Sequence, residues 1–279
     1  MTLNASCAGL VSSPHEFSYR ARDVELYALG IGAKADELDY LYEGRGPKVY
    51  PTFAVVPAFE PVFELLRQSG GNIGNMVHGA QTTTIERPLP PQGMLVTTAR
   101  IDGVYDMKRL VQMTCSTESR LEGEVACRTE WQLLFREGGG FGGPHPPKTA
   151  APKVPNGAEA SFEHAEATSR EQALLYRLSG DMNPLHADPE FARGVGFTDG
   201  PILHGLATYG FAARAIILRA CDGDGSRMRS LTAQFRKPVW PGDTLKTVGY
   251  RVGDDVVFKT YAGGREDAPV AAGYATLVW

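Results

Sequence analysis

A short polar segment in the second half of the chain carries the residue types of an acid–base site. The stretch LSGDMNPLHADPEF, residues 178–191, places Asp181, Asn183 and His186 within six positions, framed by apolar residues. Such groups are costly to bury unless they are paired or used. An Asp and a His on an irregular loop can converge on one water molecule, with the Asn between them as an orienting hydrogen-bond partner. One interpretation of the segment is therefore a site that activates water.

The same segment also has a purely structural interpretation. A D-x-N-P sequence is typical of an Asx-turn or an N-cap, in which Asp181 and Asn183 bond only to nearby backbone. Taken alone, the segment favours that interpretation. The run PILHGL at 201–206 and the landmarks that the two halves share favour the catalytic one. We interpret His204 in this run as a structural histidine hydrogen-bonded near a helix start, because no second and third zinc ligands stand at usable spacing.

The composition indicates a globular protein and argues against several classes of function. The 279 residues are 43% hydrophobic, which is enough for a substantial core. A formal charge of -4 with scattered Lys and Arg argues against a surface for nucleic acid or an anionic membrane. No run approaches the ~18 apolar residues of a spanning helix, and the N-terminus lacks a signal-peptide pattern. The four cysteines show no CxxC pair, so we expect reduced thiols in an intracellular protein.

The chain is predicted to contain an internal duplication. Three landmarks recur in order at an offset of 149 or 150 residues: Tyr27 and Tyr176, Pro51 and Pro201, and the segments 87–91 and 237–241. A stretch rich in Gly and Pro separates the halves and is unsuited to a helix or an internal strand. We therefore expect an N-terminal repeat at 1–136, a linker at 137–157 and a C-terminal repeat at 158–279.

Both repeats show the same order of expected elements: a short helix, a loop, a longer apolar helix and several strands. Residues 202–220 are apolar nearly all round, which is typical of a helix enclosed by other structure. Strands are expected at 76–87, 94–104, 110–117, 124–136, 229–237, 244–252, 256–261 and 270–279. The pattern predicts an α+β fold in which a long antiparallel sheet curls round a buried helix.

Two segments of the second repeat resemble a known family. YRLSGDMNPLH at 176–186 and PILHGL at 201–206 look like the MaoC-like (R)-specific 2-enoyl-CoA hydratases of type 2, which include the hydratase region of peroxisomal multifunctional beta-oxidation enzymes. Further counterparts occur in order along the chain: YALG at 27–30, HG at 78–79, GGFGG at 139–143 and FRKPVWPG at 235–242. The resemblance implies a double hotdog fold, a homodimer, an acyl-CoA thioester substrate and no metal or redox cofactor. The implied reaction is reversible hydration of trans-2-enoyl-CoA to (R)-3-hydroxyacyl-CoA in fatty-acid metabolism.

The resemblance also implies roles for individual residues. Asp181 and His186 share the acid–base work, and Asn183 positions the water or the substrate. Gly205 offers its backbone N–H to the thioester oxygen, because a helix start has free N–H groups and a dipole that favours negative charge. Substrate contacts are expected at His78, Gly79, Lys108, Met182, Pro184, Leu185 and Phe235.

Basic residues are the candidates for binding the CoA phosphates. Lys108 is implied by the resemblance, although Asp106-Met107-Lys108 departs by one position from the family's Asp-Lys pair. Arg229, Arg236 and Lys237 are further candidates near the expected site. Each of these side chains is also typical of a solvated surface charge.

The first repeat is predicted to lack catalysis and to hold the acyl tail. The offset of 149 residues places Gly32 against Asp181 and Glu37 against His186, so one site per chain is expected. Its central helix is interrupted by proline near position 57 and again at 61, and we expect it to be short or broken. Our hypothesis is that this leaves room for a long or bulky tail, and a kinked but ordinary helix is the alternative.

Two rival functions remain open from the sequence. One is a MaoC-like dehydratase acting on an acyl-carrier-protein thioester or a specialised branched acyl thioester. The other is a non-catalytic thioester-binding subunit, against which the presence of Asp181, Asn183 and His186 argues. The terminus LVW lacks a peroxisomal SKL-type address, so we expect a cytoplasmic protein, with the peroxisome as the alternative.

Overall fold

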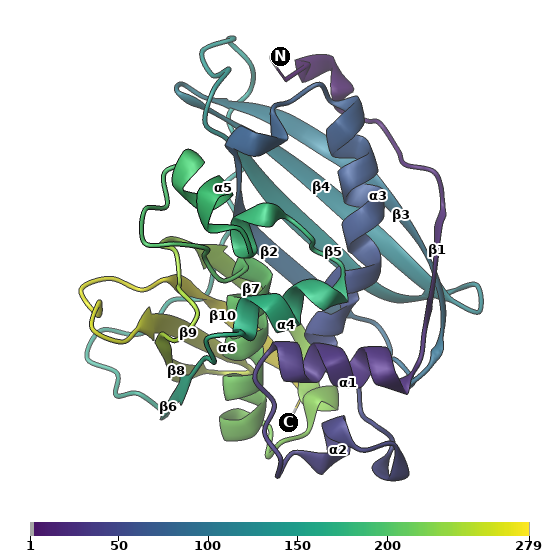
Figure 1. Cartoon of the computed structure of the whole chain (residues 1–279), viewed down its shortest axis with the longest axis vertical. Coiled ribbons are helices and arrows are strands. Elements are labelled where there is room, and N and C mark those ends of the chain that lie inside the picture. The colour runs from purple at the N-terminus through teal and green to yellow at the C-terminus, as the bar shows by residue number, and fades with distance from the viewer. Residues whose placement is uncertain (1–2, 279) are drawn as a thin grey trace.

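The computed structural model describes residues 3–278, which form one ten-stranded antiparallel sheet with helices (Figure 1). The strands of the first repeat are β1 (His15–Tyr19), β2 (Met76–Ile85), β3 (Gly93–Met107), β4 (Leu110–Leu121) and β5 (Glu124–Phe135). Those of the second repeat are β6 (Phe162–Ala167), β7 (Met228–Phe235), β8 (Thr244–Val252), β9 (Asp255–Ala262) and β10 (Ala271–Leu277). The α-helices are α1 (Ala21–Gly30), α2 (Leu38–Leu41), α3 (Val55–Gln68), α4 (Gln172–Tyr176), α5 (Pro189–Gly194) and α6 (Gly205–Ala220). Across the sheet the strands run β1-β3-β4-β5-β2-β7-β10-β9-β8-β6.

The two repeats join where β2 pairs with β7. Thr82 lies directly opposite Thr232, and their hydroxyl oxygens are 3.0 Å apart. These two threonines are separated by 150 residues, the same offset that relates the start of α3 to the start of α6. The halves thus repeat one order of elements about a local two-fold axis, as the recurring landmarks predict.

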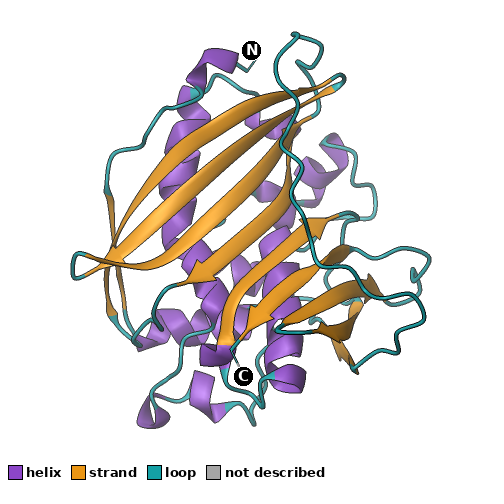
Figure 2. Cartoon of the chain, turned by 180° about the vertical axis from the view of Figure 1, so that it is seen from behind, coloured by secondary structure: helices purple, strands orange, loops and turns teal. Residues whose placement is uncertain are grey.

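The long helices lie on one face of the sheet. Figure 1 shows α3 over the strands of the first repeat and α6 over those of the second. Figure 2 shows the opposite face, which is crossed by a long loop instead of a helix. Residues 136–161, which include the predicted linker at 137–157, contain no helix or strand. No helix within residues 3–278 has the length and apolar character needed to cross a bilayer.

Helix α6 is the enclosed helix that the sequence predicts. Every residue from Leu206 to Ile217 is buried, and the small residues allow close contact with neighbouring segments. At Gly210 an added Cβ would lie 2.2 Å from the Cγ2 atom of Ile31, so the segment after α1 packs directly on the helix backbone. The helix therefore begins in a fixed position, which matters for the groups at its N-terminus.

Helix α3 departs from the expectation. It is continuous over 14 residues, so the prediction of a short or broken helix is wrong. Pro57 lies in the first turn, where a backbone N–H has no intrahelical partner to lose. Pro61 lies inside the helix and does remove one hydrogen bond, yet Val62, Leu65 and Leu66 are fully buried. Burial of these side chains under the sheet keeps the helix intact.

A buried ion cluster ties the repeats together. Arg214 of α6 is 2% exposed, and its Nε donates to both carboxylate oxygens of Glu37, at 2.9 and 2.8 Å. Its Nη1 donates to Glu166 of β6, and the Tyr50 hydroxyl donates to Glu37 at 2.6 Å. Burial opposes ionisation of Glu166, but a hydrogen bond from His164 and the charge of Arg214 outweigh it and lower its pKa to about 2. Glu37 is the residue that the duplication matches to His186.

Candidate active site

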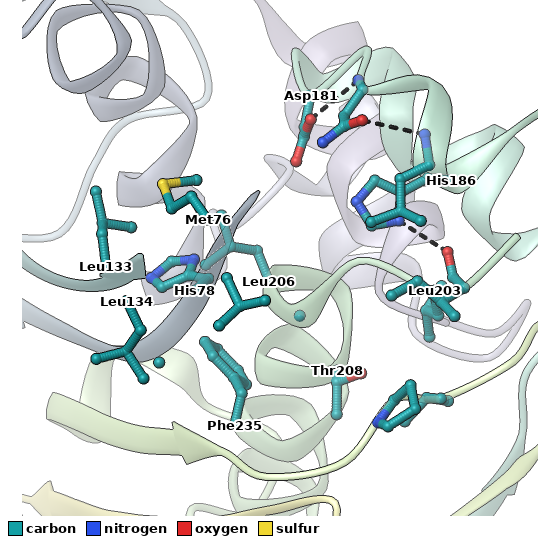
Figure 3. Close-up of a pocket in the computed structure, with 18 of the residues that line it drawn as sticks. Met76, His78, Leu133, Leu134, Asp181, His186, Leu203, Leu206, Thr208 and Phe235 are labelled. Carbon is teal, nitrogen blue, oxygen red and sulfur yellow. Dashed lines mark hydrogen bonds between the residues drawn. The ribbon is translucent and has the colours of Figure 1, made fainter. Parts of the chain in front are cut away.

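The loop between α4 and α5 carries the acidic and amide groups in two successive turns. Asp181 Oδ1 accepts a hydrogen bond from the Asn183 backbone N–H at 3.1 Å, and Asn183 Oδ1 accepts one from the Leu185 N–H at 3.0 Å. These are the local turn bonds of the structural interpretation. Both side chains nevertheless line a cavity. Asp181 lies on the same side of it as His186 (Figure 3). The turns therefore fix the two groups at the cavity wall.

His186 is buried and holds a defined tautomer. Its Nδ1 lies 2.8 Å from the Ile202 carbonyl oxygen, which can only accept, so Nδ1 carries the proton and Nε2 a lone pair. Burial lowers the pKa of His186, whereas burial raises the pKa of Asp181 against the opposing charge of His186. One polar atom from each group lies within 4.8 Å of the other. The two shifts bring the pKa values of the pair closer together, which suits proton transfer within it.

His204 lies at the start of α6, hydrogen-bonded as the sequence predicts. Its Nε2 is 3.1 Å from the Asp181 carbonyl oxygen, and its ring stacks on His186 with centroids 3.7 Å apart and planes at 26°. The fold brings possible metal ligands of Asp181, His186 and His204 within 4.8 Å, which their sequence spacing does not predict. Each imidazole uses one nitrogen in a hydrogen bond to a backbone carbonyl, which leaves one nitrogen on each ring.

The cavity has a volume of about 350 Å³ and is lined by both repeats. Gly205 is the first residue of α6, where the N–H has no intrahelical partner and the helix dipole is positive. An added Cβ at Gly205 would lie 3.5 Å from the Phe235 ring, so glycine keeps the space beside this N–H open. The arrangement can stabilise an oxyanion within reach of an acid–base pair.

His78 lies across the cavity from the acid–base pair (Figure 3). The register of β2 shifts between His78 and Ala80, which leaves Gly79 in a bulge beside the cavity. The His78 ring stacks on Trp131 at 4.9 Å and meets Phe235 edge to face at 5.1 Å. Burial lowers the pKa of His78 to about 4, and its Nε2 is buried without a partner among residues 3–278. A neutral imidazole is thus available to a polar group of a ligand.

Most of the site residues expected from the sequence line this one cavity. They are Asp181, Asn183, His186, Gly205, His78, Gly79, Leu185 and Phe235. Three others lie outside its lining: Lys108 in the turn between β3 and β4, and the exposed Met182 and Pro184. A substrate contact at these three positions stays a prediction.

The first repeat contributes a wall of the cavity whose individual residues were not predicted from the sequence. The additional lining residues include Phe59, Phe63, Trp131, Leu133, Leu134 and Arg136. They reach the cavity because β2 pairs with β5 and α3 crosses the sheet, and no local motif signals that arrangement. Of the basic candidates, Arg236 and Lys237 line the cavity, whereas Arg229 forms an ion pair with Glu86 at 2.9 Å.

Comparison with known proteins matches each repeat to a family. A model described as MFE-2 hydratase 2 N-terminal domain matches residues 17–137, and a MaoC like domain model matches residues 153–269. The 3-hydroxyacyl-thioester dehydratase Y of Mycobacterium tuberculosis is 36% identical, over 96% of this chain and 94% of that protein. The peroxisomal enoyl-CoA hydratase 2 of Arabidopsis thaliana is 36% identical, over 94% of this chain and 91% of that protein.

A solved structure supports the same relationship over the full length. The crystal structure of a MaoC-like dehydratase from Phytophthora capsici has a TM-score of 0.88 at 28% identity, over 99% of this chain and 98% of that chain. With the shared sheet and its two long helices, this confirms the α+β double hotdog fold expected from the sequence. The chain therefore belongs to the MaoC-like hydratase 2 family, whose members join an MFE-2 hydratase 2 N-terminal domain to a MaoC-like domain.

Proposed function

We propose that this protein catalyses the reversible hydration of trans-2-enoyl-CoA to (R)-3-hydroxyacyl-CoA. The observation that carries the proposal is the Asp181 and His186 pair beside the free N–H of Gly205, in a cavity that is otherwise largely apolar. The names of the relatives, enoyl-CoA hydratase 2 and 3-hydroxyacyl-thioester dehydratase, support an enoyl or hydroxyacyl thioester as substrate. A hydratase and a dehydratase catalyse the two directions of one reaction.

The chemistry requires one proton to leave the water and one to reach C2. The Asp181 and His186 pair takes the first and supplies the second, so the pair is unchanged after each turnover. The lone pair on His186 Nε2 faces the water, because Nδ1–H is bonded to Ile202. The hydroxyl oxygen adds to C3 while negative charge develops on the thioester oxygen, which the Gly205 N–H stabilises. These proton transfers need no metal or redox cofactor.

The phosphates of CoA are proposed to lie at the basic residues of the cavity. Arg136 and Arg236 are exposed and line it from β5 and from the end of β7. Lys237 lines it too, but its Nζ lies 2.7 Å from an Asp267 carboxylate oxygen, so its charge already has a partner. Guanidinium groups bind phosphate in a bidentate manner, which favours the two arginines over Lys108.

The acyl tail is proposed to lie against the first repeat. Phe59 and Phe63 of α3 stack at 4.1 Å, and with Trp131 they form an aromatic end wall of the cavity. An intact α3 bounds this space instead of leaving it open, so the wall limits the length of the tail. We expect linear acyl chains of short to medium length to be preferred over bulky ones.

Removing part of this wall is expected to favour longer substrates. Phe63→Ala should raise kcat/KM for hexadecenoyl-CoA relative to crotonyl-CoA about tenfold, because each additional buried methylene contributes ~0.8 kcal/mol. The measurement is the ratio of kcat/KM for the two substrates in both proteins. Phe191→Ala is the matched control, since Phe191 is a half-exposed phenylalanine on α5 outside the lining. An unchanged ratio in Phe63→Ala would show that the tail lies elsewhere.

The test of the function is loss of enoyl-thioester absorbance with crotonyl-CoA and decenoyl-CoA, followed by determination of the hydroxyl configuration. Rapid formation of the (R) product is expected. The second candidate is a dehydratase acting on acyl-carrier-protein thioesters, which the name of the mycobacterial relative leaves open. Faster turnover of the carrier-protein substrate than of the CoA substrate would favour it, and tight binding without turnover would indicate a non-catalytic subunit.

Two further proposals concern assembly and location. We propose a homodimer, which sedimentation of the purified protein would test. The relatives include proteins named as peroxisomal, whereas the sequence favours the cytoplasm, so we propose a cytoplasmic enzyme. Imaging of the tagged protein in its own cells distinguishes the two compartments.

A further inference from the structure

His204 contacts both acid–base residues and directly precedes Gly205 in the chain. We infer that His204 is a positioning residue that holds Asp181, His186 and the Gly205 N–H in one geometry for proton transfer. The inference deepens the proposed function and rests on it. It assigns a role in catalysis to a side chain that sequence spacing marks only as structural.

The first observation is that His204 is buried and held by its ring contacts and its backbone, while its Nδ1 has no partner among residues 3–278. It is 1% exposed, and its ring lies between His186 and Tyr176, with centroids at 3.7 and 4.9 Å. Its carbonyl oxygen accepts hydrogen bonds from the N–H groups of Ala207 and Thr208, both at 3.1 Å. The same residue therefore caps the helix whose first free N–H belongs to Gly205.

The second observation is that each contact reaches a different reacting group. The Nε2–H of His204 donates to the backbone carbonyl of Asp181, which fixes the turn that carries the carboxylate. The His204 ring stacks on one face of His186, and the Nδ1 of His186 is bonded to the Ile202 carbonyl. Together these two contacts restrict rotation of the His186 side chain. A misplacement of about 1 Å in such a site lowers the rate by about 100-fold.

The third observation concerns charge around His186. The groups that face the stacked imidazoles are Asp181 from the same loop, and Tyr176 and Arg177 from the end of α4. Burial lowers the pKa of His204, and the charges of His186 and Arg177 lower it further. A neutral His204 covers one face of His186 and keeps water away from it, so it helps to keep His186 neutral as well.

Two variants separate the hydrogen bond to Asp181 from the ring contact with His186. His204→Phe keeps an aromatic ring over His186 but removes the bond to Asp181, and we expect kcat to fall about 100-fold with KM changed less than threefold. His204→Gln keeps a donor for Asp181 but removes the ring. We expect its acidic limb of kcat/KM to move to higher pH, toward the ordinary histidine pKa of about 6.5. His145→Gln in the exposed linker is the control and should match the wild type.

A substrate-free measurement keeps this inference distinct from the proposed function. The pKa of His186 is followed by NMR titration in the wild type and in His204→Gln, with thermal unfolding to establish that each variant is folded. A raised His186 pKa in His204→Gln supports the inference even if no enoyl-CoA is hydrated, in which case only the proposed function fails. Unchanged kcat in His204→Phe, or an unchanged His186 titration in His204→Gln, overturns the inference. Should His204→Phe not fold, His204→Gln alone decides it.

Discussion

Asp181→Asn and His186→Asn are each expected to lower kcat for decenoyl-CoA by about 1,000-fold, because acid–base groups contribute ~100- to 10,000-fold each. An amide can hold the water in place but cannot take its proton or return one to C2. Asn at position 186 can still donate to the Ile202 carbonyl, so the loop should keep its conformation. Steady-state rates and the circular dichroism spectrum of each variant are the measurements.

A matched substitution and the pH profile sharpen this test. Asp188→Asn, in the same loop, changes a carboxylate that accepts a hydrogen bond from the Glu190 N–H at 2.8 Å and lies outside the cavity lining. It should retain nearly full activity. Since burial lowers the pKa of His186 below 6.5, the wild type should keep its plateau of kcat/KM through pH 6.5 and lose activity only at lower pH. Retention of more than a tenth of the rate in Asp181→Asn would remove that residue from the mechanism.

Arg214→Met is expected to lower the free energy of unfolding by about 3 to 5 kcal/mol, because it leaves the buried carboxylate of Glu37 without a counter-ion. Glu166 loses its bond to Arg214 as well but keeps its ion pair with Lys34, at 2.9 Å. Denaturant unfolding at pH 7 measures the difference in the free energy of unfolding between the wild type and the variant. Arg128→Met is the control, since Arg128 is 45% exposed and its ion pairs with Glu86 and Glu118 should contribute less than about 1 kcal/mol.

The difference in the free energy of unfolding between wild type and Arg214→Met should change with pH in a defined direction. The pKa of Glu166 is about 2 in the folded protein and near 4.5 when unperturbed, so its ion pair stabilises the fold fully above pH 4.5. That contribution is lost as the pH falls from 4.5 toward 2. In Arg214→Met, protonation of the buried carboxyl groups stabilises the fold instead. The difference in the free energy of unfolding between wild type and variant should therefore narrow over this range. A difference in unfolding free energy that stays constant with pH would mean that packing, and not charge, accounts for the lost stability.

The elements that could be predicted from the sequence are those with a strong local pattern. The eight expected strands occur within a few residues of their predicted positions, because alternation on a half-buried sheet leaves a signal of period two. The edge strands β1 and β6 were missed, since HEFSY and FEHAEA are short and carry charged side chains. Helix α6 was expected to begin at position 202 but begins at Gly205, because the His204 carbonyl accepts the first hydrogen bonds of the helix.

The site could be predicted only where its residues are close in sequence. Asp181 and His186 lie on one loop, so a short motif is enough to find them. Trp131 and Phe63 reach the cavity through strand pairing and helix placement, which are long-range contacts. The error over α3 has the same origin, because local proline rules count the lost hydrogen bond at Pro61 and not the burial that compensates for it.

The ion cluster at Glu37 also bears on how this chain can evolve. The offset of 149 residues matches Glu37 to His186, and the Glu37 carboxylate is a buried partner of Arg214 from the other repeat. A histidine at position 37 would leave Glu166 as the remaining counter-ion of Arg214 and would weaken the fold. It would not by itself create a second acid–base pair, because the same offset matches Gly32 to Asp181. A chain with two working sites would therefore need changes at both positions and a new partner for Arg214. Stability, and not catalysis, favours the carboxylate at position 37.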